Sequence, residues 1–292
     1  MIPPAKGSNH DVSVVILTKN SAETIQPCLD SVVAERPREI IVVDAFSTDG
    51  TAAILRHYDA RLLFDPMNSL GYSRKLGVDA ARGNFVMFVD SDVVLVKGCI
   101  MRMKRDLQRF GWVGTQARLL STGNLSYWRK AEDQLFGAEF NRAGPKTRIV
   151  TAATLFYRNI LLQYPFDVKF EKSCEDMDLC LRLANHNHRV GISGASAYHI
   201  GKNSFQAFAK RLFNYGLGDA VFGVKHRVIR ERIVGRLKSM VSQMPRSSIE
   251  ENLALVPYWS VSGLIQFSGF LVGLAKIHES HPFGIALVSG RD

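Results

Sequence analysis

The chain has 292 residues, of which 46% are hydrophobic, and it carries a formal net charge of +10. This length and composition suit one large buried core, or one domain with an appendage, so a disordered chain is not the default expectation. The positive charge favours anionic partners such as nucleotides, phosphorylated lipids or a membrane surface. The excess lies in the C-terminal third, where the only acidic residues of segment 202–246 are Asp219 and Glu231.

The cysteines, at positions 28, 99, 174 and 180, form no C-x-x-C pair and show no zinc-like spacing with the eight histidines. We therefore expect reduced thiols that serve as packing residues, and no structural zinc site. The N-terminal segment "MIPPAKGSNHD" lacks the apolar region of a cleavable secretion signal. This predicts a catalytic part on the cytoplasmic side.

The first hundred residues alternate between short apolar runs and helix-like segments. Helices are expected at residues 22–34, after Asp49 and at 69–81, and strands at residues 12–18, 39–45, 61–64 and 84–90. Pro27 falls inside the first of these helices, although proline fits only a first turn. Strands that are apolar on both faces, with helices between them, predict an α/β fold with a parallel sheet covered on both sides.

Polar residues end the predicted strands. Thr18 and Asn20 follow the first strand and Asp44 ends the second, while Asp90 and Asp92 end the fourth. Ligands of an open parallel sheet bind outside the carboxyl ends of its strands, so these residues should line one cleft. The chain has no G-x-G-x-x-G after the first strand and no G-x-x-x-x-G-K-[ST], which argues against a dinucleotide-binding fold and a P-loop.

The run "FVMFVDSDVVL" (residues 85–95) places two like charges, Asp90 and Asp92, at the end of an apolar strand. Alternate residues of a strand point to the same side, so the two carboxylates would share one space. They repel unless a cation or a shared proton intervenes. The ordinary alternative is a solvated turn, where Asp is common.

Four segments in this order resemble the family 2 glycosyltransferases of the GT-A fold: "VSVVILTKNSAETIQPCLDSV", "EIIVVDAFSTDGT", "SRKLGVDAARGNFVMFVDSDV" and "EDMDLCLRL". Members of that family move a sugar from a nucleotide donor with inversion at the anomeric carbon. The resemblance covers residues 11–215 and implies a mostly parallel GT-A sheet. It also implies nucleoside recognition by Thr18, Asn20, Asp44 and Arg74. A carboxylate such as Asp44 accepts the imide N–H of uracil, and Arg74 stacks on a base or pairs with phosphate.

The family's D-x-D matches Asp90 and Asp92. The resemblance places Asp92 nearest a divalent metal ion and Asp90 towards the ribose or diphosphate, where it is also a candidate metal ligand. Mg²⁺ or Mn²⁺ takes oxygen ligands from one or two carboxylates and from substrate phosphates, and neutralises the leaving diphosphate. The two acids tolerate each other under this hypothesis because the cation and the diphosphate complete the site.

A second acidic group lies in "CEDMDLCLRL" (residues 174–183). In the family this position supplies the general base, which corresponds to Asp176 with Glu175 beside it. Inversion needs a base that takes the proton of the acceptor hydroxyl as its oxygen attacks the sugar. Asp178 is expected instead to be an N-cap or first-turn residue of the following helix.

"YHIGKNS" (residues 198–204) resembles the family's loop that closes over the donor diphosphate. His199 is a candidate metal ligand or phosphate contact, and Lys202 would offset phosphate charge. One departure is that the family's common "DDGS" reads "DAFS" here, with Ala45 and Phe46, so one frequent acid is absent. The residues do not distinguish a uracil from a guanine nucleotide.

Three alternatives stay open. "VMFVDSDVV" also resembles the nucleophile motif of haloacid-dehalogenase-like phosphatases, although that motif normally lies on the first strand. The basic C-terminal third would suit a nucleic-acid surface, but it lacks interleaved stacking aromatics, so no nucleic-acid partner is predicted. A polyprenyl-phosphate glycosyltransferase, which uses a phosphate acceptor, is the third alternative.

The C-terminal region contains an uncharged stretch, residues 253–275, with a G-x-x-x-G pattern at Gly269 and Gly273. An apolar stripe at helical spacing, flanked by basic residues, precedes it and consists of Ile229, Ile233, Leu237 and Val241. We expect this region to lie on or in an anionic membrane. The alternative is packing on its own domain or on a second copy, as in a homodimer.

The sequence therefore predicts a metal-dependent inverting hexosyltransferase that uses a UDP- or GDP-sugar and works at the cytoplasmic face of a membrane. Residues 1–225 are expected to form the GT-A domain, and residues 226–292 a basic, apolar helical segment. The predicted acceptor is a saccharide or lipid-linked glycan with a free hydroxyl.

Overall fold

The computed structural model describes residues 9–122, 126–200, 204–242 and 249–280. The chain divides into two compact units. The α/β unit consists of Met1–Glu171 and Glu175–Asn203, and the helical unit consists of Lys172–Cys174 and Ser204–Asp292. The predicted boundary at residue 225 coincides with the end of helix α8, which is itself part of the helical unit.

Strands and helices alternate through the first half of the α/β unit. Their order is β1 Val12–Thr18, α1 Ile25–Ala34, β2 Glu39–Asp44, α2 Thr51–Leu55, β3 Arg61–Phe64, α3 Leu70–Ala80 and β4 Phe85–Asp90. The second half adds β5 Val93–Leu95, α4 Cys99–Phe110, β6 Gly114–Ser121, α5 Tyr127–Phe140, β7 Gly144–Lys146, β8 Ala153–Tyr157, α6 Arg158–Gln163, α7 Glu175–Asn185 and β9 Val190–His199.

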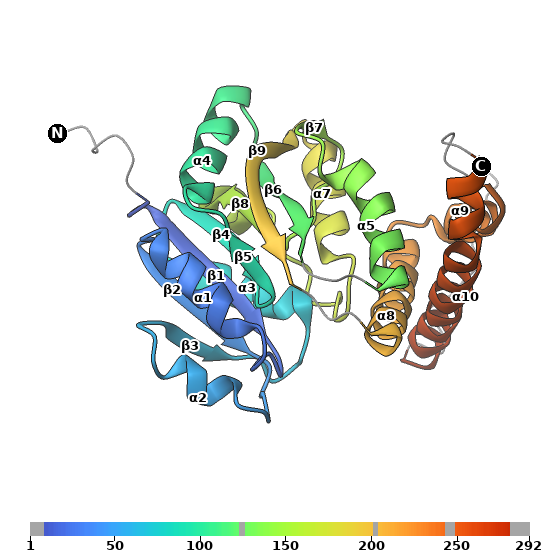
Figure 1. Ribbon diagram of the computed structural model, residues 1–292, viewed down its shortest axis with the longest axis horizontal. Helices are drawn as coiled ribbons and strands as arrows, with labels where there is room; N and C mark the ends of the chain where they lie inside the picture. Colours follow the sequence, from blue (N-terminus) through green and yellow to red (C-terminus); the bar gives the residue numbers. More distant parts are fainter. Residues whose placement is uncertain (1–8, 123–125, 201–203, 243–248, 281–292) are drawn as a thin grey trace. The chain divides into compact units, whose positions relative to one another are not determined.

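The described strands form one nine-stranded sheet in the order β3-β2-β1-β4-β8-β6-β9-β5, with β7 paired to β9 (Figure 1). Strands β3, β2, β1 and β4 are mutually parallel. Strand β8 runs antiparallel to both β4 and β6, whereas β6 and β9 are parallel. The predicted α/β fold is confirmed, with an antiparallel part beyond β4.

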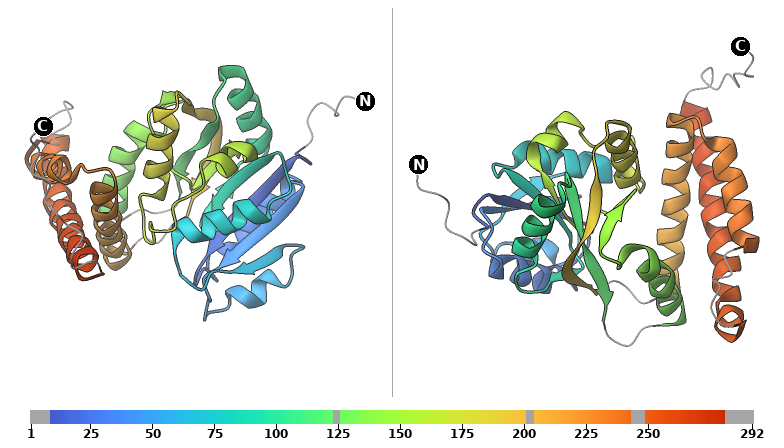
Figure 2. Two further views of the ribbon diagram at one scale, coloured as in Figure 1. Left: turned by 180° about the vertical axis from the view of Figure 1, so that it is seen from behind. Right: turned by 90° about the horizontal axis from the view of Figure 1, so that it is seen from above.

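Side chains of the central strands alternate between two apolar cores. Val14 and Ile16 of β1 join the core that includes helices α1 and α4. Val15 joins the opposite core, which includes side chains of α3, α6 and α7. Figures 1 and 2 show helices on both faces of the sheet. Because both faces are covered, the central strands are apolar throughout, as a buried parallel sheet requires.

Helix α1 begins later than predicted. It starts at Ile25 and not at Ala22, so Pro27 lies in its first turn, where proline is tolerated. The reason is local: the backbone N–H groups of Ser21 and Ala22 donate to side chains of Thr51 and Asp49. Those N–H groups hold the loop after β1 against the start of α2.

The helical unit contains α8 Phe205–Lys225, α9 Ile229–Ser242 and α10 Ile249–Ser280. Helices α8 and α10 approach closely through small residues. A Cβ atom on Gly269 would collide with the backbone of Phe213, and one on Gly273 would lie 2.7 Å from Ala220 Cβ. A Cβ on Gly216 of α8 would likewise collide with the backbone of Gln266. The G-x-x-x-G pattern is typical of helix contacts, and Gly269 and Gly273 make such a contact here.

Helix α10 continues through Pro257. Within the described residues, one stretch, Pro257–Glu279, is long and apolar enough to cross a membrane by length and composition, with a mean hydropathy of 1.4. Only 22% of the most apolar part of this stretch is buried. The exposed side chains of Leu264, Leu271 and Val272 recur at helical spacing, so α10 presents an apolar stripe away from its contact with α8.

Candidate functional site

Parallel pairing brings the predicted polar residues of three strands to one sheet edge. Thr18 is the register partner of Asp44, and Leu17 is the partner of Asp90. The side chains of Thr18 and Asp44 are buried. Among the described residues, Thr18 Oγ1 has no hydrogen-bond partner, although it is buried. Since a buried hydroxyl normally bonds to something, this atom is available to a ligand at the edge.

The loops that follow these strands are bonded to one another. Asn20 donates its backbone N–H to Ser47 Oγ at 2.8 Å, and its side-chain oxygen accepts from Thr48 N at 2.8 Å. Ser47 in turn donates to both carboxylate oxygens of Asp44, from its hydroxyl at 2.5 Å and its N–H at 3.0 Å. Asn20 and Asp44, both predicted to bind nucleotide, thus shape the loops of this edge in the structure.

The D-x-D residues lie where β4 ends. Strand β4 stops at Asp90, and Ser91 and Asp92 form a turn before β5, so strand alternation does not govern Asp92. The turn is tied to the loop after β1, since Ser21 Oγ and Ser91 Oγ lie 2.9 Å apart. Burial raises the pKa of Asp90 to about 6; Arg74 offsets part of this effect, and the charge of Asp92 adds to it. The charge of Asp92 thus acts on Asp90, as expected for two neighbouring carboxylates.

His199 contacts Asp92, and Arg129 contacts His199. His199 ends β9 opposite Val93, and its Nε2 lies 3.2 Å from Asp92 Oδ2. Arg129 Nη2, from α5, lies 2.8 Å from His199 Nδ1. A guanidinium only donates, so Nδ1 accepts and the imidazole proton resides on Nε2, directed at Asp92. Burial alone would raise the pKa of Asp92, but His199 and Arg129 hold that pKa below its ordinary value.

Sequence reasoning missed Arg129. The side chain is buried, contacts Ser121 Oγ at 3.0 Å, and forms an ion pair with Asp133 at 3.3 Å. No motif marks it, because it meets His199 only after β6, α5 and β9 have come together. Its one local signal is Ser126, which caps α5 by accepting from Arg129 N.

Arg74 is a buried side chain that lies between the D-x-D and the acidic pair Glu175–Asp176. It lies 2.8 Å from Glu175 Oε1 and 3.7 Å from Asp90 Oδ1. The sequence predicts that Arg74 contacts the nucleotide, but here its guanidinium faces two protein carboxylates. Glu175 Oε2 and Arg74 Nε are buried without a hydrogen-bond partner among the described residues. The pair therefore joins the D-x-D to the start of α7.

Asp176 follows Glu175 in the first turn of α7. Burial, and then the neighbouring charge of Glu175, raises the pKa of Asp176 to about 7. A carboxylate that titrates near neutral pH is suited to accept a proton from a substrate. Asp178 is fully buried and pairs with Arg182 at 2.8 Å, which confirms its predicted structural place in the first turn.

The residues present fit a hard divalent cation that shares its shell with a substrate. Within the described residues, no group of three or more His, Cys, Asp or Glu side chains is placed to hold a metal. Asp90 and Asp92 provide two carboxylates, which is the usual protein share for Mg²⁺ bound with phosphates. His199 directs its Nε2–H at Asp92, so direct metal ligation by His199 requires a different proton arrangement. Lys202 lies outside the described residues.

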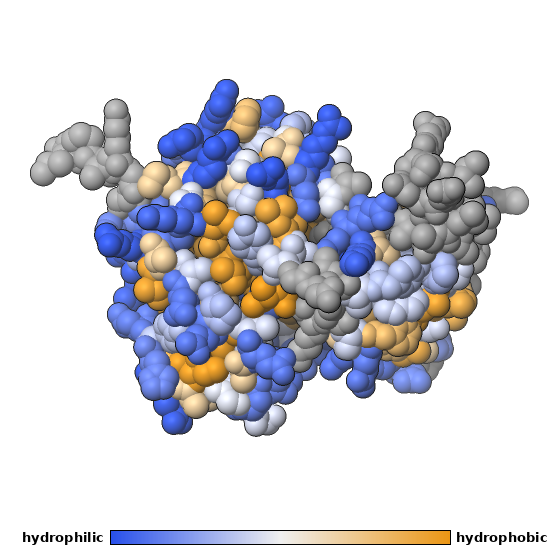
Figure 3. Space-filling view, viewed as in Figure 1, coloured by the Kyte–Doolittle hydropathy of each residue, from blue (hydrophilic) through white to orange (hydrophobic). Residues whose placement is uncertain are grey.

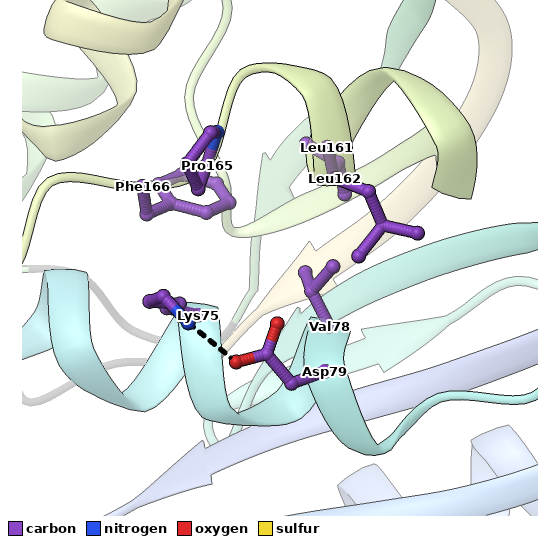
Figure 4. A pocket seen from close by; sticks show the side chains of 7 residues that line it. All are labelled: Lys75, Val78, Asp79, Leu161, Leu162, Pro165 and Phe166. Atoms are coloured by element: carbon purple, nitrogen blue, oxygen red, sulfur yellow. Dashed lines mark hydrogen bonds and ion pairs between the residues drawn. The ribbon is translucent and has the colours of Figure 1, made fainter.

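Two further features of the described residues are a surface hollow and the free cysteines. A small surface hollow of about 130 Å³ lies between α3 and α6, where Lys75 and Asp79 form an ion pair (Figure 4). Its lining contains none of the predicted site residues. The cysteines are free thiols: Cys28, Cys99 and Cys180 are buried and Cys174 is half-buried, so the prediction of unpaired packing cysteines is confirmed.

Comparison with known proteins identifies the family of the segment that contains these strand ends. Residues 13–163 match the family model described as Glycosyl transferase family 2. That range includes Thr18, Asp44, Arg74 and the D-x-D, and ends before α7. The family match contradicts the phosphatase alternative, which rested on strand β4 and the D-x-D.

Two curated proteins illustrate the relationship. "Succinoglycan biosynthesis protein ExoO" of Rhizobium meliloti is 33% identical over 122 residues, which are 40% of this chain and 34% of that protein. "Poly(ribitol-phosphate) beta-glucosyltransferase" of Bacillus spizizenii is 34% identical over 102 residues, or 31% of this chain and 16% of that protein. The matched segments thus span 34% and 16% of these longer relatives.

Solved structures of S. aureus TarS share the fold. TarS 1–349 in complex with UDP-GlcNAc superposes with a TM-score of 0.54 at 17% identity, covering 92% of each chain. TarS 1–349 in complex with UDP gives a TM-score of 0.52 at 18% identity, covering 96% of this chain and 95% of that one. At this identity the likeness supports the fold alone: a GT-A-like α/β sheet followed by helices.

Proposed function

Because the chain belongs to glycosyl transferase family 2, we propose that it moves a sugar from a nucleotide-diphosphate donor to an acceptor hydroxyl in a metal-dependent, inverting reaction. The observation that carries the proposal is the Asp90–Asp92 pair at the carboxyl edge of the parallel strands. There Asp90 is close enough to Asp92 for the second charge to raise its pKa. A site that concentrates negative charge in this way suits a cation and a diphosphate.

Asp90 and Asp92 would hold Mg²⁺ or Mn²⁺, which supplies positive charge for the leaving diphosphate. Arg129 fixes the imidazole of His199, and His199 orients Asp92. The protein thereby presents one oxygen of Asp92 to His199 and leaves the other for the cation. Lys202, from the segment after β9, is proposed to add charge opposite the phosphates.

The nucleoside would lie beside Asp44 and Thr18. The unpartnered hydroxyl of Thr18 and the carboxylate of Asp44 are neighbours in register, so one polar ligand can meet both. Each oxygen of Asp44 already accepts from Ser47 and keeps a second acceptor site for the ligand. Asn20 donates its backbone N–H to Ser47 and so helps to fix the loop that follows Asp44. We favour a uridine donor, in keeping with the UDP complexes of TarS, and keep a guanosine donor as the alternative.

Asp176 is the proposed general base. It would take the proton of the acceptor hydroxyl while that oxygen attacks the anomeric carbon from the face opposite the diphosphate. Glu175 neutralises Arg74 and raises the pKa of Asp176 towards neutrality. A phosphate acceptor would need little help from such a base. The environment of Asp176 thus favours a hydroxyl acceptor over the polyprenyl-phosphate alternative.

The helical unit is the proposed site of membrane attachment. Helix α10 combines a stretch of spanning length with an exposed apolar stripe, and the C-terminal third carries the excess of basic residues. A location at the cytoplasmic face of a membrane, and a lipid-linked glycan as acceptor, follow from this proposal. Contact between two copies of α10 in a homodimer is the alternative use of the same stripe.

A thermal-shift panel tests the proposal. We expect UDP, or failing that GDP, to raise the melting temperature in the presence of Mn²⁺ and to do so much less with EDTA. CDP and TDP are the comparison nucleotides in the same panel. A chain that none of the four nucleotides stabilises, with or without Mn²⁺, would refute a nucleotide-sugar donor.

A further inference from the structure

Two phenylalanines form an exposed stacked pair at the edge of the α/β unit. The rings of Phe46 and Phe64 have centroids 5.4 Å apart and an interplanar angle of 25°. Phe46 is 58% exposed and Phe64 is 51% exposed. Apolar side chains gather around β3 and α2 on the face shown in Figure 3. We call Phe46 and Phe64 the aromatic ledge.

The backbone of Phe46 is held in a conformation that its side chain does not favour. Its φ is +55°, in the left-handed region where glycine is at ease and a bulky residue is rare. The motif that this loop resembles, "DDGS", has glycine at the position of Phe46. A buried ring would repay the strain by packing in a core, but this ring is more than half exposed. Retained strain of this kind is characteristic of functional sites.

The ledge borders the proposed nucleoside site. Phe46 lies two residues after Asp44, and Phe64 is the register partner of Asp44 on β3. The loop that carries Phe46 is fixed at its next residue, Ser47, which donates to Asp44 and accepts from Asn20. The ledge is therefore attached to the same strand ends that carry Thr18 and Asp44.

We propose that the nucleobase of the donor stacks on the aromatic ledge, with Phe46 as a residue that determines donor affinity. This inference rests on the proposed function, since it assigns the base-contacting surface of that same site. Nucleobases present flat π faces, and stacking on an aromatic side chain is favourable for every base. The polar contacts at Asp44 and Thr18 would then select among bases, while the ledge supplies affinity common to all.

The test is calorimetric titration of the full chain with UDP and GDP in Mg²⁺. Phe46→Ala and Phe64→Ala should each weaken nucleotide binding by about 5- to 150-fold, the range for loss of one base–aromatic stack. Inorganic diphosphate, which has no base, should bind all variants equally well. Phe46→Tyr should restore wild-type affinity. Phe46→Gly removes both the ring and the strain, so it should melt no lower than Phe46→Ala while binding as poorly.

Phe110→Ala is the matched control. Phe110 is 44% exposed and stacks on Trp112 at 4.7 Å, but it lies at the end of α4, outside the proposed site. This variant should bind UDP as the wild type does. Nucleotide affinities within twofold of wild type for both Phe46→Ala and Phe64→Ala would overturn the ledge and leave the proposed function intact. A parallel loss of diphosphate binding would also overturn it, because the pair would then support the whole edge. Wild-type protein that binds no nucleotide would overturn both proposals.

Discussion

Arg74 Nη1 lies 2.8 Å from Glu175 Oε1, and only 5% and 4% of the two side chains are exposed. The pair connects helix α3 with the first residue of α7. Arg74 also lies 3.7 Å from Asp90, so one guanidinium is shared between the D-x-D and the acidic pair that contains Asp176. Displacing Arg74 should therefore disturb both carboxylate groups at once.

Removing one partner of this buried pair should destabilise the protein strongly. We expect Arg74→Leu to lower the free energy of unfolding by about 3–5 kcal/mol, because Glu175 is left as an uncompensated buried charge. The double variant Arg74→Leu/Glu175→Leu should recover part of that loss. Urea denaturation measures both. Lys75→Ala is the control: its pair with Asp79 is exposed and should be worth less than about 1 kcal/mol. Equal losses for Arg74→Leu and Lys75→Ala would contradict this account.

Asp92→Ala should abolish sugar transfer and the metal-dependent part of nucleotide binding, because the diphosphate would lose its bridging cation. Titration of UDP or GDP with and without Mn²⁺ measures the effect. Asp79→Ala removes an exposed carboxylate of α3 and should change neither quantity. If the Asp92 variant keeps wild-type affinity in Mn²⁺, the metal assignment is wrong.

Asp176→Asn should leave donor binding intact and lower kcat by roughly 10²-fold or more, the range for loss of a general base. The base must be deprotonated to act, and its pKa is raised to about 7. Wild-type kcat should therefore fall as the pH drops below 7, and the variant should lose this dependence. If the variant retains activity within a few-fold of wild type, another residue is the general base or the acceptor is a phosphate.

Helix contact within the helical unit gives a paired glycine test. A Cβ on Gly218 would collide with Ser173, whereas none of the described residues lies within 4 Å of a Cβ on Gly235 in α9. We expect Gly218→Ala to cost about 1–3 kcal/mol through overpacking. Gly235→Ala should stabilise by about 0.5–1 kcal/mol through helix propensity. Thermal unfolding compares them, and equal melting temperatures would argue against the packing described for Ser173.

The exposed stripe of α10 predicts membrane binding. The full chain should co-sediment with vesicles that contain anionic lipid, and high salt should weaken this binding. Leu264→Glu combined with Leu271→Glu should keep the protein in the supernatant. Leu162→Glu, at a position on α6 that is 47% exposed, should leave the protein bound to the vesicles. If the 292-residue chain stays unbound at low salt, the stripe serves contact between copies and not membrane binding.

Local pattern was sufficient for the parallel half of the sheet. Strands β1 and β3 have the predicted bounds, and Asp44 and Asp90 end strands as expected, because alternation of apolar runs and helices is a local signal. The antiparallel pairing of β8 was not predicted, since register beyond β4 depends on long-range contacts. For the same reason the contact of Arg129 with His199 was not predicted, because it depends on three segments that are distant in the sequence. The strain at Phe46 was visible only as a departure from a motif.

Residues Lys172–Cys174 pack with α8 although Glu175, the next residue, opens the proposed catalytic helix. Ser173 Oγ donates to Asn214 O at 2.8 Å, and Cys174 adopts a φ of +69° where the chain leaves the helical unit. Genetic recombination that replaced only the segment after residue 203 would separate α8 from the tripeptide that fits it. Chimaeras between family members should therefore carry both segments from one parent, and we expect exchange of the C-terminal helices alone to destabilise the protein.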